Sequence, residues 1–137
     1  GNKDKLFEKK IYSVNKNLEI FYSCYKPQNI KKFRGKKLLA LAGIGNPENF
    51  FNLIKKHNLQ VKEKKVFPDH YRFSENEITK IINNASKKKY KIIMTEKDYF
   101  KIKKFKIKNL DFLKVKLEIN KKNKLLEKLK NLYDKNS

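Results

Sequence analysis

The chain has 137 residues, enough for one domain with a modest hydrophobic core. Its longest apolar run, Leu38 to Ala42, is too short to span a bilayer, and its polar, lysine-rich start shows no apolar signal region. Cys24 is the only cysteine, which excludes an intramolecular disulfide and a cysteine metal cluster.

The formal net charge is +22, which suggests attraction to nucleic acid or to an anionic membrane surface. Nearly all of the positive charge is lysine, because Arg34 and Arg72 are the only arginines. Nucleic-acid readers usually use arginine, whose planar fork suits phosphates and base edges. Asparagine and isoleucine are also abundant, as A/T-rich codons would produce. We therefore favour compositional drift with general anion attraction, and both alternatives stay open.

The first third of the chain predicts one helix and one strand before a connector. Residues 2–16 carry a few apolar positions among lysines and predict a short helix or lead-in. Residues 18–25 alternate between apolar and polar and predict a strand, which Pro27 ends. Residues 28–37 are expected to connect it to the next strand.

The middle of the chain alternates between strand and helix signals. The apolar run Leu38 to Ala42 is typical of a strand buried on both faces of a parallel sheet. Asn46 and Pro47 suit the N-cap and N1 positions of a helix that runs to about Lys56. A second strand is expected over residues 60–67.

The last part predicts two more helix starts and two more strands. Ser74 and Glu77 form a capping box before a helix with isoleucines at helical spacing. Residues 90–94 predict a strand with Thr95 as the following N-cap, and residues 112–119 alternate as a further strand. Asn120 is expected to cap a last amphipathic helix. Strands alternating with helices predict an α/β fold, with a small, mostly parallel sheet flanked by helices.

A glycine turn, Gly43-Ile44-Gly45-Asn46, follows the strongest strand. Ligands of open α/β sheets bind outside the carboxyl ends of strands, where glycines let backbone amides approach an anion and a helix N-terminus adds partial positive charge. The alternative is a tight turn that needs only a positive φ. The motif is neither a complete dinucleotide fingerprint nor a phosphate-binding P-loop.

Two further polar groups follow strand ends. Asp69 and His70 lie in the Phe67-Pro68-Asp69-His70 loop, and an imidazole is well suited to proton exchange near neutral pH. The alternative is a helix-entry loop with Asp69 on backbone amides and His70 exposed. A third block, Thr95-Glu96-Lys97-Asp98, is either a helix cap or a polar cluster. We expect all three motifs to meet at one edge of the sheet.

The order and spacing of three blocks, residues 41–51, 67–70 and 95–98, resemble the C-terminal part of the tetraacyldisaccharide 4'-kinase (lipid A 4'-kinase) family. The resemblance runs from about Gly35 to Ile102, and the flanks match in pattern only. It implies a two-lobed enzyme, with a P-loop-type N-terminal lobe and a smaller Rossmann-like C-terminal lobe joined by a strand linker.

The resemblance also implies an activity. The family transfers the ATP γ-phosphoryl group, with Mg²⁺, to the 4'-hydroxyl of a tetraacyldisaccharide 1-phosphate in lipid A biosynthesis, at the cytoplasmic face of the bacterial inner membrane. By motif position, His70, next to Asp69, would support the catalytic aspartate of the other lobe. The resemblance implies that residues 43–46 and 95–98 line the cleft, and it assigns no metal ligand in this chain.

This chain departs from the family in lacking the N-terminal lobe. We expect residues 1–34 to form a lead-in and interlobe linker strand, and residues 35–137 the C-terminal lobe. ATP and Mg²⁺ would then bind mainly to the missing lobe, and the chain alone would be inactive. The expected partners are that lobe, a lipid A precursor and an anionic membrane surface, which the chain would meet as a peripheral protein.

Two rival functions remain beside the kinase interpretation. One is a basic nucleic-acid-binding α/β module, which predicts tight, salt-dependent binding to DNA or RNA. The other is a non-catalytic scaffold that binds a nucleotide or a partner at the Gly43 edge.

Overall fold

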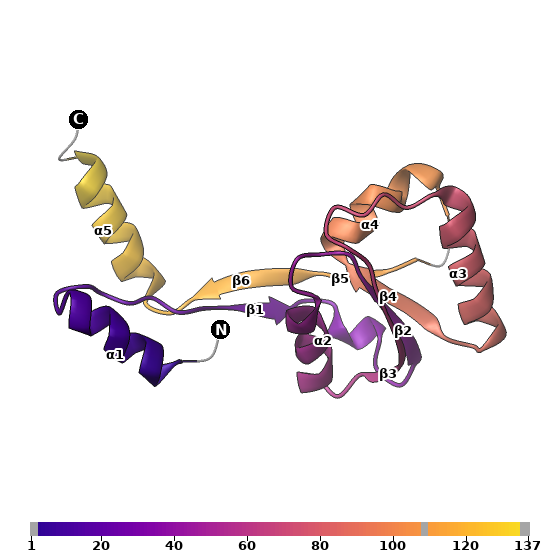
Figure 1. The fold of residues 1–137 in the computed structure, drawn as a ribbon, viewed down its shortest axis with the longest axis horizontal. Helices are drawn as coiled ribbons and strands as arrows, with labels where there is room; N and C mark the ends of the chain where they lie inside the picture. Colours follow the sequence, from indigo (N-terminus) through magenta and orange to yellow (C-terminus); the bar gives the residue numbers. More distant parts are fainter. Residues whose placement is uncertain (1–2, 108–109, 135–137) are drawn as a thin grey trace. The chain divides into compact units, whose positions relative to one another are not determined.

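The computed structural model describes residues 3–107 and 110–134. The chain forms two compact units: Pro27–Val115, here called the α/β unit, and Gly1–Lys26 with Lys116–Ser137, here called the terminal unit. In chain order, the elements are α1 Lys5–Val14, β1 Ser23–Pro27, η1 Ile30–Lys32 (a 3₁₀ turn), β2 Lys37–Ala42, α2 Pro47–Lys56, β3 Gln60–Val66, α3 Glu75–Lys87, β4 Lys91–Thr95, α4 Glu96–Ile102, η2 Lys103–Phe105 (a second 3₁₀ turn), β5 Phe112–Leu113, β6 Val115–Ile119 and α5 Lys122–Asp134 (Figure 1).

The α/β unit is built on a four-stranded sheet in the order β3-β2-β4-β5. All of its neighbouring strands run parallel, with β2 in the middle paired to both β3 and β4. The predicted α/β fold class, a small parallel sheet flanked by helices, is therefore confirmed.

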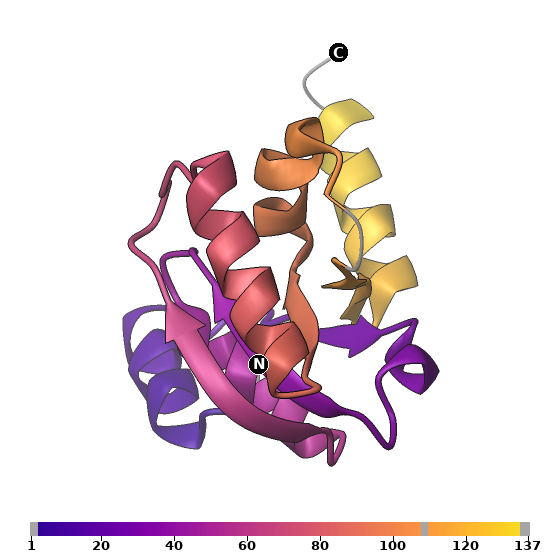
Figure 2. The same cartoon turned by 90° about the vertical axis from the view of Figure 1, so that its right-hand side faces the viewer.

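The apolar run of β2 is buried because both faces of the sheet are covered. Leu38, Ala40 and Ala42 join one core cluster with the apolar face of α2, whereas Leu39 and Leu41 join a second cluster with α3 and α4. Alternate side chains of a strand point to opposite faces, so one continuous run supplies both clusters. Figure 1 shows α2 on one side of the strands and α3 on the other, and Figure 2 shows α3 and α4 side by side.

Three of the predicted helix starts are confirmed by their hydrogen bonds. The side chain of Asn46 accepts from the Asn49 N–H, with Pro47 in the first turn of α2. Ser74 accepts from the Glu77 N–H, and Thr95 accepts from the Asp98 N–H. Each of these caps lies at the end of a loop that follows a strand, at the carboxyl edge of the sheet. The caps therefore determine where these loops end and the helices begin.

The terminal unit holds α1, α5 and most of a two-stranded sheet of β1 and β6, drawn as arrows in opposite directions (Figure 1). None of the described residues of α1 or α5 is buried. No described helix of either unit is long and apolar enough to cross a membrane.

Three sequence predictions need correction. The strand predicted over residues 18–25 begins only at Ser23. The single strand predicted over 112–119 is two strands, because β5 pairs with β4 and β6 pairs with β1. Asn120 is not the cap of α5: its side-chain oxygen accepts the Tyr22 N–H at 2.7 Å and so ties the two ends of the terminal unit together.

Candidate functional site

The three polar motifs meet at the carboxyl edge of the sheet. A Cβ placed on Gly43, after β2, would lie 3.4 Å from the Phe67 Cβ and 3.6 Å from the Pro68 carbonyl oxygen, after β3. The same Cβ would lie 3.1 Å from Oδ1 of Asp98, in the first turn of α4. The predicted convergence is confirmed, since parallel strands bring their carboxyl ends together.

Asp98 is the centre of a buried polar network. Its Oδ2 accepts the Gly43 N–H at 2.8 Å and the Thr95 hydroxyl at 2.7 Å, and its Oδ1 accepts from the Lys101 ammonium at 3.0 Å. Lys101 also donates to the Gly43 carbonyl at 3.1 Å. The Asp98 residue is 1% exposed, so these partners replace the water that the carboxylate lost on burial.

This network fills the place where an open α/β sheet usually holds an anionic ligand. The chain leaves β2 toward α2 on one face of the sheet and leaves β4 toward α4 on the other, so the switch point lies between these strands. The anion at this point is the protein's own Asp98 carboxylate. The Gly43 N–H already has an acceptor, and it is therefore not available to a phosphate.

The two glycines of the turn make room for two carboxylates. Gly35 is the one described glycine with a positive φ, so the turn does not need Gly43 or Gly45 for backbone conformation. A Cβ on Gly43 would crowd Asp98, as given above, and a Cβ on Gly45 would lie 3.3 Å from Oδ2 of Asp69. The positive-φ explanation is wrong, and close approach of side chains replaces it.

Asp69 and His70 form the exposed part of the edge. Asp69 Oδ1 accepts the His70 backbone N–H at 2.9 Å and the Lys97 ammonium at 3.0 Å. The His70 Nε2 lies 3.8 Å from Asp69 Oδ2, and its side chain is 83% exposed. The hydrogen bonds from Lys97 and from the His70 N–H lower the pKa of Asp69 below its ordinary value, so this carboxylate stays ionised at neutral pH.

The backbone of His70 is unusual for its position. Its φ is +59°, in the left-handed region that a non-glycine residue seldom adopts. Asn58, Lys89 and Lys106 share this conformation after helix ends, where it is routine, and Lys121 shares it in the turn between β6 and α5. His70 lies in a loop between β3 and α3 instead. Such strain costs about 1 kcal/mol and is concentrated at functional sites.

The other predicted site residues divide into two groups. Lys97 belongs to the Asp69 pair and Thr95 to the Asp98 network, whereas Glu96 lies half-buried in the first turn of α4. Ile44 packs against the core cluster that includes α2, and Asn46 is the α2 cap. These contacts give Ile44 and Asn46 structural roles in the described chain.

Sequence reasoning missed Lys101. Its ammonium joins the Asp98 carboxylate to the Gly43 carbonyl, 58 residues away in the chain. The available signal was the spacing of three between Asp98 and Lys101, which places both on one face of a helix. In a lysine-rich chain that spacing is common, so it did not stand out. Within the described residues, no group of three acidic, histidine or cysteine side chains is placed to hold a metal ion.

The fold and the edge together define a small parallel α/β domain, with an ionised aspartate and an exposed histidine at the carboxyl ends of its strands. The chain belongs to the LpxK family: the family model for tetraacyldisaccharide-1-P 4'-kinase matches residues 2–134. The family resemblance found in the sequence is therefore confirmed.

Individual relatives agree with this assignment. The tetraacyldisaccharide 4'-kinase of Pelagibacter ubique (strain HTCC1062) is 33% identical over 139 residues, which cover 99% of this chain and 44% of that protein. The same-named protein of Rickettsia akari (strain Hartford) is 35% identical over 94 residues, 69% of this chain and 29% of that protein. The chain thus spans less than half the length of these relatives.

One solved structure has a similar fold. It is the crystal structure of the "apo" form of LpxK from Aquifex aeolicus in complex with ATP. The TM-score is 0.55 and the sequence identity 19%, and the match covers 94% of this chain and 45% of that one. At this identity the similarity supports the fold alone. Any function of this chain is therefore inferred from its own residues.

Proposed function

We propose that this chain is the C-terminal lobe of a lipid A 4'-kinase. The complete enzyme transfers the ATP γ-phosphoryl group to the 4'-hydroxyl of a tetraacyldisaccharide 1-phosphate, a precursor in lipid A biosynthesis. Family membership over residues 2–134 supports the reaction. The observation that carries the site assignment is the pairing of Asp69 with His70 on the exposed carboxyl edge of the sheet.

In this proposal His70 is a positioning residue that faces the other lobe. Asp69 is fixed by Lys97 and by the His70 N–H, which leaves the His70 imidazole exposed to reach a group outside the chain. An imidazole that hydrogen-bonds a catalytic carboxylate orients it and tunes its pKa while the sugar hydroxyl attacks. Lys97 and Asp69 hold the loop that carries the imidazole.

ATP and Mg²⁺ would bind mainly to residues outside this chain. The Gly43 N–H is taken by Asp98, and the described residues offer no trio of metal ligands, so they do not fit a phosphate-magnesium site. Mg²⁺ would supply charge neutralisation on the phosphates when bound. Of residues 43–46 and 95–98, Gly45 and Lys97 lie against Asp69, so these two would support the Asp69–His70 loop of the cleft.

The terminal unit supports the proposal of a second lobe. The buried hydrophobic side chains of the described residues all lie between Phe33 and Leu113, within the α/β unit. All of the exposed large hydrophobic side chains except Val66 and Phe100 lie in the terminal unit. Apolar surface of this kind marks an interface. We assign the N-terminal lobe of the complete enzyme as its partner, with β1 as part of the linker.

The surface charge suits a peripheral position. The net charge of +22 would attract the chain to anionic lipid at the cytoplasmic face of the bacterial inner membrane, where the lipid A precursor is found. Each lysine near such a surface contributes about 1 kcal/mol. This attraction would bring the substrate's own membrane close to the carboxyl edge.

The test is a substitution in the complete two-lobed enzyme. We expect His70→Asn to lower kcat about 10- to 100-fold with little change in the KM for the lipid, because orientation of the base matters in the transition state. Asparagine tolerates the left-handed backbone at this position, so the loop is preserved. His57→Asn, at the C-cap of α2, is the matched control. An unchanged kcat in His70→Asn would remove His70 from the machinery.

A further inference from the structure

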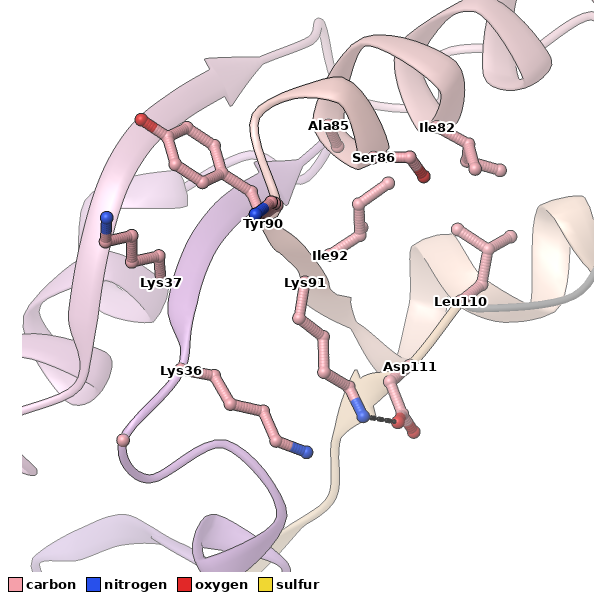
Figure 3. Close-up of a pocket in the computed structure, with 12 residues that line it drawn as sticks. Lys36, Lys37, Ile82, Ala85, Ser86, Tyr90, Lys91, Ile92, Leu110 and Asp111 are labelled. Carbon is pink, nitrogen blue, oxygen red and sulfur yellow. Dashed lines mark ion pairs between the residues drawn. The ribbon is translucent and has the colours of Figure 1, made fainter.

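A hollow lies at the amino edge of the sheet, at the other end of the strands from the candidate site. It has a volume of about 770 Å³ and lies where β2 and β4 begin, under the C-terminal half of α3 (Figure 3). That size falls within the range of small-molecule sites. The six residues of β2 separate this hollow from the Gly43 turn by about 20 Å. The hollow therefore does not include the Gly43 turn or the Asp69–His70 loop.

The hollow contains a lysine that is held in place. The Lys91 ammonium lies 2.8 Å from Asp111 Oδ2 and over the ring of Phe33, 5.5 Å from its centroid. The Lys91 side chain is 26% exposed, so it is not a freely moving surface lysine. A preorganised cation of this kind loses less entropy when it binds an anion than a solvated one does.

The only carboxylate that lines the hollow, among the described residues, is already neutralised. Asp111 accepts from Lys32 at 2.6 Å as well as from Lys91. Burial alone would raise the pKa of Asp111, but the hydrogen bonds from these two ammonium groups outweigh it and lower the pKa. With two cations on one anion, the cluster carries a net positive charge.

Further ammonium groups add to this charge. Lys36, Lys37 and Lys89 also line the hollow, and in the described part of the chain no carboxylate forms an ion pair with them. Figure 3 shows the Lys36 ammonium pointing toward the Lys91–Asp111 pair. An anion seated between Lys36 and Lys91 would therefore meet two cations, one of them already fixed.

The opposite wall of the hollow is apolar. Ile82 of α3, Ile92 of β4 and Leu110 line it, beside the Ser86 side chain (Figure 3). A ligand that fits both walls has an anionic head and an apolar or ring-shaped body. Phosphate suits the head, since one dianion satisfies two ammonium groups at once and lysine is an established phosphate ligand.

We infer that the amino edge of the sheet holds a binding site for an organic phosphate, with the phosphate between Lys36 and Lys91 and the organic part against Ile82 and Leu110. Asp111 is the residue that positions Lys91. The phosphate can belong to a soluble molecule or to a lipid headgroup, and these sources share the same chemistry at the two lysines.

The experiment titrates the 137-residue chain with inorganic pyrophosphate and follows its backbone amides by NMR. We expect saturable shifts at Lys36, Ser86 and Lys91, with smaller shifts at Gly43. Lys36→Glu should weaken pyrophosphate binding about tenfold, because it reverses one charge at the phosphate and leaves the Lys91–Asp111 pair intact. Lys62→Glu, the same charge change on exposed β3, is the control and should leave binding within about twofold.

A second arm separates the two sources. If vesicles of phosphatidylglycerol displace pyrophosphate and shift the same amides, whereas phosphatidylcholine vesicles do not, the natural phosphate is a lipid headgroup. If the phosphatidylglycerol vesicles leave these amides unshifted while pyrophosphate shifts them, it is a soluble organic phosphate. The inference is overturned if shifts spread over lysines of the whole surface, or if Lys62→Glu weakens binding as much as Lys36→Glu. Neither result depends on kinase activity, so failure here leaves the proposed function untouched.

Discussion

The α/β unit and the terminal unit of this chain are stabilised in different ways. The α/β unit buries two apolar clusters on the two faces of its sheet. The described residues of the terminal unit include no fully buried side chain. Its contacts include the ion pairs of Glu19 with Lys124 and Lys128 and the hydrogen bond from the Tyr22 N–H to Asn120. Hydrophobic burial dominates folding free energy, whereas exposed ion pairs contribute little. Of the two units, only the α/β unit therefore has a buried apolar core that could stabilise it on its own.

The largest expected effect compares one substitution in both units. Leu41→Ala, at a side chain of β2 that is 2% exposed, should lower the free energy of unfolding by about 3 kcal/mol, because it leaves a cavity in the core. Leu129→Ala, on α5 at 52% exposure, should change it by less than about 0.5 kcal/mol in this chain. Urea unfolding followed by circular dichroism measures both. Equal losses would mean that the terminal unit has a core of its own.

The next effect concerns the buried carboxylate. Asp98→Asn keeps the shape of the side chain but removes its charge next to Lys101, and it should cost about 2 kcal/mol of unfolding free energy. Asp4→Asn in the terminal unit is the matched change, at the N-cap of α1. Asparagine caps a helix as well as aspartate does, so a cost below about 0.5 kcal/mol is expected there. A neutral Asp98→Asn would show that the network is dispensable.

A smaller effect is the pH response of the terminal unit. The hydrogen bonds from Lys124 and Lys128 lower the pKa of Glu19 from 4.5 to about 2. Because the folded pKa is depressed, the stabilisation is fully present above pH 4.5 and is lost as the pH falls through about 2. Carboxyl NMR titration of Glu19, with amide exchange of α5 as the readout, checks this. Titration of Glu19 near 4.5 would show that the two lysines do not hold it.

The smallest expected signal tests the nucleic-acid alternative. Lysines occur in both units, and most of them are exposed, so the attraction to phosphate backbones should be general rather than concentrated at one site. We expect no tight binding of a 20-mer DNA or RNA duplex at about 150 mM salt, as measured by fluorescence anisotropy, because screening weakens such contacts. Tight, sequence-selective binding would favour the rival function.

The positions of the core strands and caps were predictable because they depend on neighbouring residues. The apolar run that became β2 and the caps at Asn46, Ser74 and Thr95 needed only local patterns. The break near Lys114 was not predictable. There the Lys114 N–H donates to the Asn29 side chain, 85 residues away, and this pairing separates β5 from β6.

The candidate site was partly predictable for the same reason. Parallel strands guarantee that the loops after β2, β3 and β4 meet, so the convergence of Gly43, His70 and Asp98 was expected. The reason why Gly43 and Gly45 are glycines could not be predicted. It depends on where the Asp69 and Asp98 carboxylates lie in space, which no spacing in the sequence records. The role of His70 in catalysis stays a prediction.

The two ends of the α/β unit lie side by side. The Gln28 N–H donates to the Lys114 carbonyl at 2.8 Å, and the Asn29 amide donates to the Phe112 carbonyl at 2.9 Å. The chain therefore enters and leaves this unit at one point, as an inserted module does. A short artificial linker would join its ends with little entropy cost, so the module should tolerate circular permutation or transplantation into another protein.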